Sequence, residues 1–288
     1  MPNRKKYSSL KIKSILIGTA FVAPWIIGFI VFTLYPVIVG VQLSLNAVTI
    51  KPGVLYLQWA GKEYYNYALN VSTSFKLDLG ASVMMICCSV PVVLTFSLIV
   101  AIMLNNDYKG RGFFRTVFFM PVVIMSGPVI SKLLTGNTVN FTEEGSQIVL
   151  FLSNLPILGK PCLYVLDNLV LILWFSGVQI LIFLSGLQKI SPSLYEAADI
   201  DGAGAWEKFW KITLPHIVPL AMICAVYTVV DISNYSGLRV NSDISDNIFN
   251  TSMMYSLSAA MSWIYFIVVL LILAVVFLLF KLIGRRSK

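Results

Sequence analysis

The chain has 288 residues, of which 58% are hydrophobic and only 12% are charged, and its formal net charge is +8. A soluble domain carries about 25% charged residues, so this composition excludes an ordinary soluble globular protein. Several apolar runs exceed the roughly 20 residues with which a helix crosses a bilayer. The sequence therefore predicts an all-α polytopic membrane protein.

Six transmembrane helices are predicted from these apolar runs. Their ranges are Ile15–Leu43, Leu79–Leu104, Phe113–Leu134, Leu166–Gly186, Leu214–Tyr235 and Met261–Leu282. The outer loops between them, at about 49–77, 136–165 and 236–260, are too short for a separate domain. We therefore expect an N-terminal segment over residues 1–13 and a single transmembrane domain over residues 14–288.

The first predicted helix begins like a secretory signal peptide, with Arg4-Lys5-Lys6 ahead of an apolar stretch. That stretch runs far beyond the about 7–15 residues of a signal-peptide core, and no cleavage site of small residues closes it. We therefore expect a membrane helix that the mature protein retains. Pro24 and Pro36 are expected to bend this helix or to mark its ends.

The basic residues are distributed unequally between the two sides of the membrane. With the N-terminus inside, 15 of the 21 lysines and arginines fall on inner segments, and six fall on outer segments and span ends. This asymmetry follows the positive-inside rule and predicts that both termini are cytoplasmic. The positive charge is therefore interpreted as a topology signal, and no nucleic-acid partner is expected.

The sequence contains no motif for ATP hydrolysis, catalysis or metal binding. The one Gly-Lys pair, Gly159-Lys160, lacks the upstream glycine of a phosphate-binding loop. His216 is the only histidine, and the four cysteines show no C-x-x-C spacing. We expect no catalytic residue, no metal site and no cofactor bound by this chain.

A polar, glycine-interrupted stretch stands between the fourth and fifth predicted spans. Ser191-Pro192 suits a helix start, because proline is tolerated in the first turn. Ser193 and Glu196 have the S-x-x-E spacing of a capping box, which would give Glu196 a structural role. Gly202 and Gly204 then allow a sharp change of direction.

After this turn, Trp206, Phe209 and Trp210 fall on one helical face, and Leu214-Pro215 starts the next membrane helix. The stretch is thus predicted to form a helix–turn–helix along the cytoplasmic surface. As an interfacial amphipathic segment it would rest on lipid. As a coupling element it would insert into a groove of a soluble partner. The residues alone leave both possibilities open.

The same stretch resembles the EAA signature of permease subunits of bacterial ABC importers, because E-A-A is followed by D-G-A, an aromatic residue, L-P and a later proline. The resemblance implies the type I ABC importer permease fold, with a coupling loop at residues 190–214 that docks onto an ATP-hydrolysing subunit. The contact residues carried over by the motif are Glu196, Ala197, Ala198, Asp201, Gly202 and Ala203. Asp201 could also act as a turn residue that hydrogen-bonds its own backbone.

The resemblance implies several partners for the chain. Two ATP-binding subunits would use ATP and Mg²⁺, and an extracytoplasmic solute-binding protein would deliver the solute. A second permease, usually a different chain, would complete the cavity as a heterodimer. The family implies a multi-pass protein of the bacterial cytoplasmic membrane.

The resemblance extends beyond the loop and favours the carbohydrate-uptake, maltose-type branch of the family. Pro24–Phe29 and Thr33–Pro36 are similar to the first span of carbohydrate permeases. Lys109–Thr116 is similar to their second cytoplasmic loop, and Leu184–Tyr195 to their approach to the coupling loop. The chain departs from the pattern at Thr135–Thr138, where the family often has tryptophan-rich sequence, which bears on the outer gate and the binding-protein contacts.

Polar side chains inside two predicted spans are candidates for the substrate pathway. They are Tyr227, Asp231, Asn234 and Tyr235 in the fifth span and Ser176 and Gln179 in the fourth. Tyr227, Asp231 and Asn234 share one helical face, and aromatic rings beside carboxylates and amides suit a sugar. Polar packing between helices is the alternative for these side chains, as is a pair between Asp231 and Arg239.

The sequence thus predicts the transmembrane permease subunit of an ATP-driven importer for an oligosaccharide or related carbohydrate. One alternative keeps the importer but changes the solute to glycerol phosphate, a polyamine or a peptide. Another is an ATP-independent secondary transporter in which Asp231 is linked to protons. A membrane scaffold would explain neither the loop nor the polar face within the fifth span.

Overall fold

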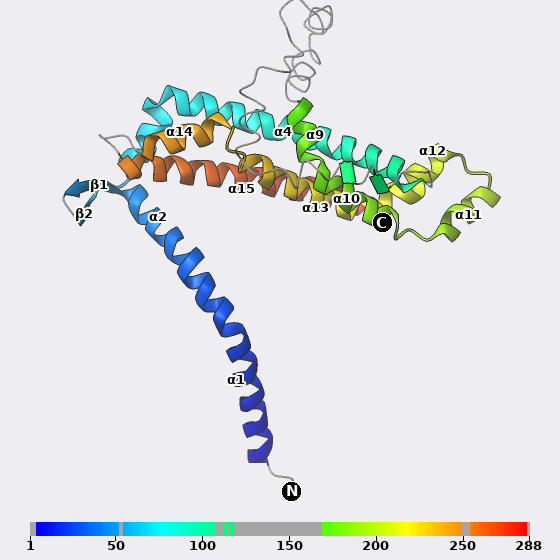
Figure 1. The fold of residues 1–288 in the computed structure, drawn as a ribbon, viewed down its shortest axis with the longest axis horizontal. Helices are drawn as coiled ribbons and strands as arrows, with labels where there is room; N and C mark the ends of the chain where they lie inside the picture. The colour runs from blue at the N-terminus through cyan, green and yellow to red at the C-terminus, as the bar shows by residue number, and fades with distance from the viewer. Residues whose placement is uncertain are drawn as a thin grey trace, which may run out of the picture. The chain divides into compact units, whose positions relative to one another are not determined.

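The computed structural model describes residues 4–51, 54–106, 112–113, 116–117, 169–248 and 254–286, and helices dominate them (Figure 1). Among the described residues, four helices are long and apolar enough to cross a membrane, and they lie at Ile17–Leu45, Thr73–Asn105, Ala205–Ser233 and Tyr255–Leu282. A shorter apolar helix lies at Gly177–Leu187. The predicted span Phe113–Leu134 falls almost entirely outside the described residues, and Leu166–Gly186 is described from Leu169 onward.

The structure divides into two units, each formed by two stretches of the chain. The first unit comprises Met1–Thr73 and Ile244–Ile264, and the second comprises Ser74–Asp243 and Tyr265–Lys288. The candidate functional residues from the sequence all lie in the second unit.

The first unit begins with a long, continuous helical segment. It consists of α1 (Arg4–Phe29), the π-helical turn η1 (Ile30–Leu34) and α2 (Tyr35–Leu45). Pro24 lies inside α1, and Pro36 lies in the first turn of α2, directly after η1. The backbone N–H of Tyr35 bonds to the carbonyl of Ile30, so the helix widens ahead of Pro36 instead of ending there.

A β-hairpin follows this helix, within a stretch that we expected to be loop. Strands β1 (Asn46–Lys51) and β2 (Val54–Trp59) pair antiparallel, from Asn46 opposite Trp59 to Lys51 opposite Val54. The Pro52-Gly53 dipeptide between the strands is a turn signal in the sequence. The Val48 backbone N–H donates to Ser256 Oγ over 3.0 Å. This bond attaches the hairpin to the Ser256 side chain of α15 (Met254–Arg286), within the first unit.

The remaining elements are helices. They are α3 (Glu63–Asn66), η2 (Tyr67–Val71), α4 (Thr73–Asn105), α9 (Leu169–Phe175), α10 (Gly177–Leu187), α11 (Pro192–Ile200), α12 (Ala205–Lys208), η3 (Phe209–Thr213), α13 (Leu214–Ser233), α14 (Arg239–Ile248) and α15 (Met254–Arg286). Helix α14 lies in the predicted outer loop, and α15 begins ahead of the predicted Met261.

The core of the second unit lies between α4, α10 and α13. Its buried side chains come from Val100, Ala101 and Leu104 in α4, from Ile180, Phe183, Leu184 and Leu187 in α10, and from Ile190, Ile217 and Cys224. Helices α10 and α13 pack closely at Gly186, where an added Cβ would overlap the side chain of Leu220. This packing holds the start of α13 against the end of α10.

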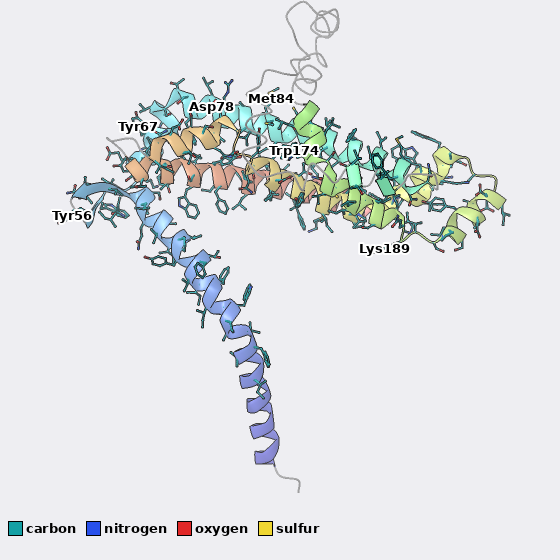
Figure 2. The ribbon with its side chains drawn as sticks, in the orientation of Figure 1. Tyr56, Tyr67, Asp78, Met84, Trp174 and Lys189 are labelled. Carbon is teal, nitrogen blue, oxygen red and sulfur yellow. The ribbon has the colours of Figure 1, made fainter. Side chains whose placement is uncertain are left out.

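The fourth predicted span is interrupted at Ser176, between α9 and α10. Ser176 Oγ donates to the carbonyl of Leu173 over 2.6 Å, and Ser97 Oγ in α4 donates to the carbonyl of Ser176 over 3.3 Å. Figure 2 labels Trp174 just before this interruption and Lys189 in the turn that leads from α10 to α11.

Candidate functional site

Helix α11 opens the polar stretch that resembles the EAA signature. It begins at Pro192, as predicted, and Ser191 precedes it with extended backbone angles of φ −62° and ψ 130°. The predicted capping box is wrong, because Pro192 starts the helix before Ser193 can cap it. Ser193 Oγ instead lies 2.7 Å from Ser191 Oγ, and Glu196 is exposed on the helix surface.

The end of α11 is a Schellman motif, which accounts for the D-G-A sequence. Gly202 has a φ of +73°, the left-handed conformation that glycine adopts without steric cost. The Ala203 N–H donates to the Ala198 carbonyl over 2.9 Å, and the Gly202 N–H donates to the Asp199 carbonyl over 3.1 Å. These two bonds satisfy carbonyls that would otherwise lack partners at the helix end.

Asp201 does not make the predicted bond to its own backbone in the described structure. It is the C-cap residue directly after α11, with φ −72° and ψ −1°, and its N–H bonds to the Ala197 carbonyl. Its side chain is exposed. The carboxylate is therefore available to a partner.

The second limb of the loop continues into the membrane helix without a break. Gly204 is extended, with φ −69° and ψ 166°, and α12, η3 and α13 follow in one 29-residue helix, Ala205–Ser233. Leu214-Pro215 therefore does not start a separate helix, because the π-helical turn η3 carries the chain through this point. Force on the second limb can thus pass directly into α13.

The predicted aromatic face of the second limb is confirmed. The Trp206 and Trp210 rings lie 5.5 Å apart, as do those of Phe209 and Trp210, and the Trp206 and Phe209 rings lie 6.4 Å apart. Trp206 is 72% exposed and Trp210 is 49% exposed. The cluster is thus a surface feature and contributes little to the core.

Two side-chain contacts join the two limbs of the loop, α11 and the helix that begins with α12. The Tyr195 hydroxyl lies 2.9 Å from Thr213 Oγ1, and Lys208 pairs with Asp199. The sequence carried no signal for these contacts, because they depend on how the turn folds one limb back on the other.

The six predicted coupling residues come together on α11 and its terminal turn. Four of them are exposed and two, Ala198 and Ala203, are half-buried. The exposed residues are Glu196, Ala197, Asp201 and Gly202. The arrangement is a short helix that exposes acidic side chains and Ala197 beside the apolar side chains of Leu194 and Ile200, which suits insertion into a groove of another protein. The docking itself stays a prediction.

The predicted pathway residues of α13 lie along its exposed side. Ile223, Tyr227 and Val230 are 55%, 38% and 41% exposed, Asn234 is exposed, and Asp231 is half-buried beside them. Asn234 Nδ2 donates to the Val230 carbonyl over 2.9 Å. In the described part of the chain no ion pair joins Asp231 to Arg239.

The other pathway candidates are packed between helices. Ser176 and Gln179 are fully buried, and Gln179 Nε2 donates to Thr228 Oγ1 over 2.7 Å. Tyr235 packs edge-on against Phe175, with ring centroids 5.8 Å apart. Thr228 is a functional candidate that sequence reasoning missed, since nothing in the sequence indicates which residue the Gln179 amide contacts. A role for these side chains in the pathway stays a prediction.

Comparison with known proteins finds relatives that are all described as membrane components of transport systems. The sequence model of the family described as "Binding-protein-dependent transport system inner membrane component" matches residues 67–288. The lactose transport system permease protein LacF of Rhizobium radiobacter is 26% identical, over 97% of this chain and 98% of that protein. The arabinooligosaccharides transport system permease protein AraP of Bacillus subtilis (strain 168) is 33% identical, over 76% of this chain and 68% of that protein.

A solved structure shares the fold. A chain in the crystal structure of a bacterial alginate ABC transporter, in complex with an alginate pentasaccharide-bound periplasmic protein, superposes with a TM-score of 0.67 at 19% identity, over 95% of this chain and 97% of that chain. The predicted fold class, a helical polytopic membrane protein of the ABC importer type, is confirmed.

Proposed function

The chain belongs to the family of binding-protein-dependent transport system inner membrane components, and we propose that it is the transmembrane permease subunit of an ATP-driven importer for an oligosaccharide or related sugar. Relatives named for lactose and arabinooligosaccharide transport support the sugar. So does the exposed side of α13, where Tyr227 offers an aromatic ring, and Asp231 and Asn234 offer hydrogen-bonding groups.

The observation that carries the proposal is the form of α11. Its exposed surface combines Glu196 with the small side chain of Ala197, and it ends in the Schellman turn at Gly202. Such a short, thin helix fits a groove on an ATP-binding subunit. The proposed complex therefore contains two ATP-binding subunits, which hold ATP and Mg²⁺ and carry out the hydrolysis.

The transport cycle follows from the continuity of the second limb with α13. When the ATP-binding subunits close on ATP, they displace α11 and the limb that begins at Ala205. This displacement moves α13 and its pathway residues, so that the cavity opens alternately to the inside and the outside. One such chain encloses half of a cavity, and a second permease, a different chain, completes it as a heterodimer.

The proposed location is the bacterial cytoplasmic membrane, with both termini and the coupling loop on the cytoplasmic side. The unequal distribution of lysine and arginine supports this orientation. The extracytoplasmic binding protein then delivers solute to the opposite side, next to the predicted outer loops.

The solute class is tested on the cognate binding protein, by calorimetric titration with oligosaccharides, glycerol phosphate, polyamines and peptides. We expect binding of at least one oligosaccharide. Binding of only a non-sugar solute would replace the proposed substrate while keeping the importer. Asp231 argues against an anionic solute, because its carboxylate would repel a phosphate on the exposed side of α13.

A further inference from the structure

The coupling loop contains two contacts between its limbs that lie outside the six motif residues. The Tyr195 hydroxyl lies 2.9 Å from Thr213 Oγ1, and Thr213 Oγ1 lies 3.4 Å from the Lys208 carbonyl, to which it donates. The Lys208 ammonium pairs with the Asp199 carboxylate, nine residues away across the turn. We name these four residues, Tyr195, Asp199, Lys208 and Thr213, the clasp.

The clasp reaches from the exposed surface to the core of the second unit. Thr213 is only 7% exposed, and Tyr195 and Ile212 pack against the buried cluster between α4, α10 and α13. Asp199, at the other end, has a side chain that is 64% exposed. The hydroxyl contact is therefore partly buried, whereas the ion pair is exposed at its Asp199 end and contributes less.

Two cavities flank the Tyr195 side chain where α11 faces the ends of α4 and α10. One has a volume of about 390 Å³, and its lining includes Gln188 and Glu196. The other has a volume of about 360 Å³, and its lining includes Phe209 and Thr213. Tyr195 lines both cavities, together with Asn105 and Leu187. One hollow thus lies beside α11 and the other beside the second limb, with Tyr195 lining both.

A helix that has a hollow beside it would bend when a partner pushes on it, unless it is tied to a stiffer element. The clasp provides that tie, because Thr213 lies within the continuous helix Ala205–Ser233. From Thr213 the same helix runs 18 residues, about 27 Å, to Asp231.

We propose that the clasp residues are positioning residues that make α11 and the helix Ala205–Ser233 move as one body, so that a displacement of α11 reaches the transport pathway. This inference rests on the proposed function, and it names the residues that would transmit the movement of the ATP-binding subunits to the transport pathway. Loss of the clasp would let the ATP-binding subunits complete their cycle while the permease responds only in part.

The test measures ATP hydrolysed per saccharide imported, in proteoliposomes that contain the full complex and the binding protein. Tyr195→Phe and Thr213→Val each remove one hydroxyl while keeping the size of the side chain. We expect the number of ATP molecules hydrolysed per imported saccharide to rise about fivefold. A factor of this size corresponds to the net free energy of one hydrogen bond. Thr213→Ser keeps the hydroxyl and should restore the wild-type ratio.

The ion pair has a matched control in the same loop. Reversing the pair that joins the limbs, with Asp199→Lys and Lys208→Asp together, should give a ratio nearer to wild type than either single change. Lys211 and Glu207 lie 3.5 Å apart within the second limb, so Lys211→Glu alone should leave the ratio unchanged.

The possible results separate this inference from the proposed function. An unchanged ratio of ATP hydrolysed to saccharide imported in Tyr195→Phe and Thr213→Val would overturn the proposed role of the clasp. This includes the case in which hydrolysis and import fall in equal proportion, which indicates a merely structural role. A wild-type complex that imports no saccharide with ATP would overturn the proposed function itself.

Discussion

The side-chain amide of Gln179 donates a 2.7 Å hydrogen bond to the hydroxyl of Thr228, and both side chains are fully buried between α10 and α13. Thr228 Oγ1 in turn donates to the Cys224 carbonyl over 2.7 Å. Buried amides that bridge membrane helices hold those helices together. This contact therefore fixes α13 against α10.

Removing the acceptor of this bond should destabilise the protein. Thr228→Val leaves the buried Gln179 amide without its partner, and we expect a loss of about 1 kcal/mol, which the thermal unfolding of the complex in detergent measures. Gln179→Leu combined with Thr228→Val should recover most of the loss, because no polar group is then left unpaired. A raised KM for import in Gln179→Leu would assign Gln179 to the pathway instead.

The turn after α11 should tolerate alanine at one glycine and not at the other. Gly202→Ala places a side chain at φ +73°, which should destabilise the turn by about 1 kcal/mol. We expect the turn to distort α11 and import to fall about fivefold. Gly204→Ala is the matched control, since Gly204 has a φ of −69° and open space around its Cβ position. Equal import rates in the two variants would show that the left-handed turn has no role in coupling.

The carboxylate of Asp231 should matter for the solute more than for stability. Asp231→Asn keeps the shape and removes the charge, so we expect about a tenfold loss in import kcat/KM with an unchanged melting temperature. Asp246→Asn changes an exposed carboxylate on α14 and serves as the charge-matched control. Wild-type kinetics in Asp231→Asn would remove this residue from the pathway.

The orientation of the chain can be measured by cysteine labelling. In a variant whose four native cysteines are replaced, Ser193→Cys on α11 should react with a membrane-impermeant thiol reagent only after the cells are opened. Tyr56→Cys on β2, whose side chain is 48% exposed, should react in intact cells. The reverse pattern would contradict the proposed cytoplasmic location of the loop.

The sequence was sufficient for four long helices among the described residues and for the local form of α11, because apolar length and proline position act over a few neighbouring residues. Pro192 fixes its φ at a value that suits a helix start, and Gly202 can take the left-handed conformation that ends the helix, so both predictions are confirmed. The capping box was wrong because Ser191 and Ser193 are both plausible caps, and Pro192 decides between them only through backbone sterics.

The features that the sequence did not reveal depend on contacts between distant residues or on subtle local signals. The interruption at Ser176 lies within unbroken hydropathy, and its carbonyl is approached by Ser97 from another helix. The contacts of Tyr195 with Thr213 and of Gln179 with Thr228 likewise require the folded chain. The β-hairpin had a local signal in Pro52-Gly53, which the membrane-like composition of its surroundings concealed.

The central claim is that ATP hydrolysed by partner subunits drives sugar import through the coupling loop. Its most direct test is the uptake of radiolabelled oligosaccharide into proteoliposomes that contain this chain, the second permease, the ATP-binding subunits and the binding protein. We predict uptake that requires ATP and is largely lost in Glu196→Gln but kept in Glu207→Gln, with the complex assembled in both. Uptake by this chain alone, driven by an ion gradient without ATP, would contradict the claim.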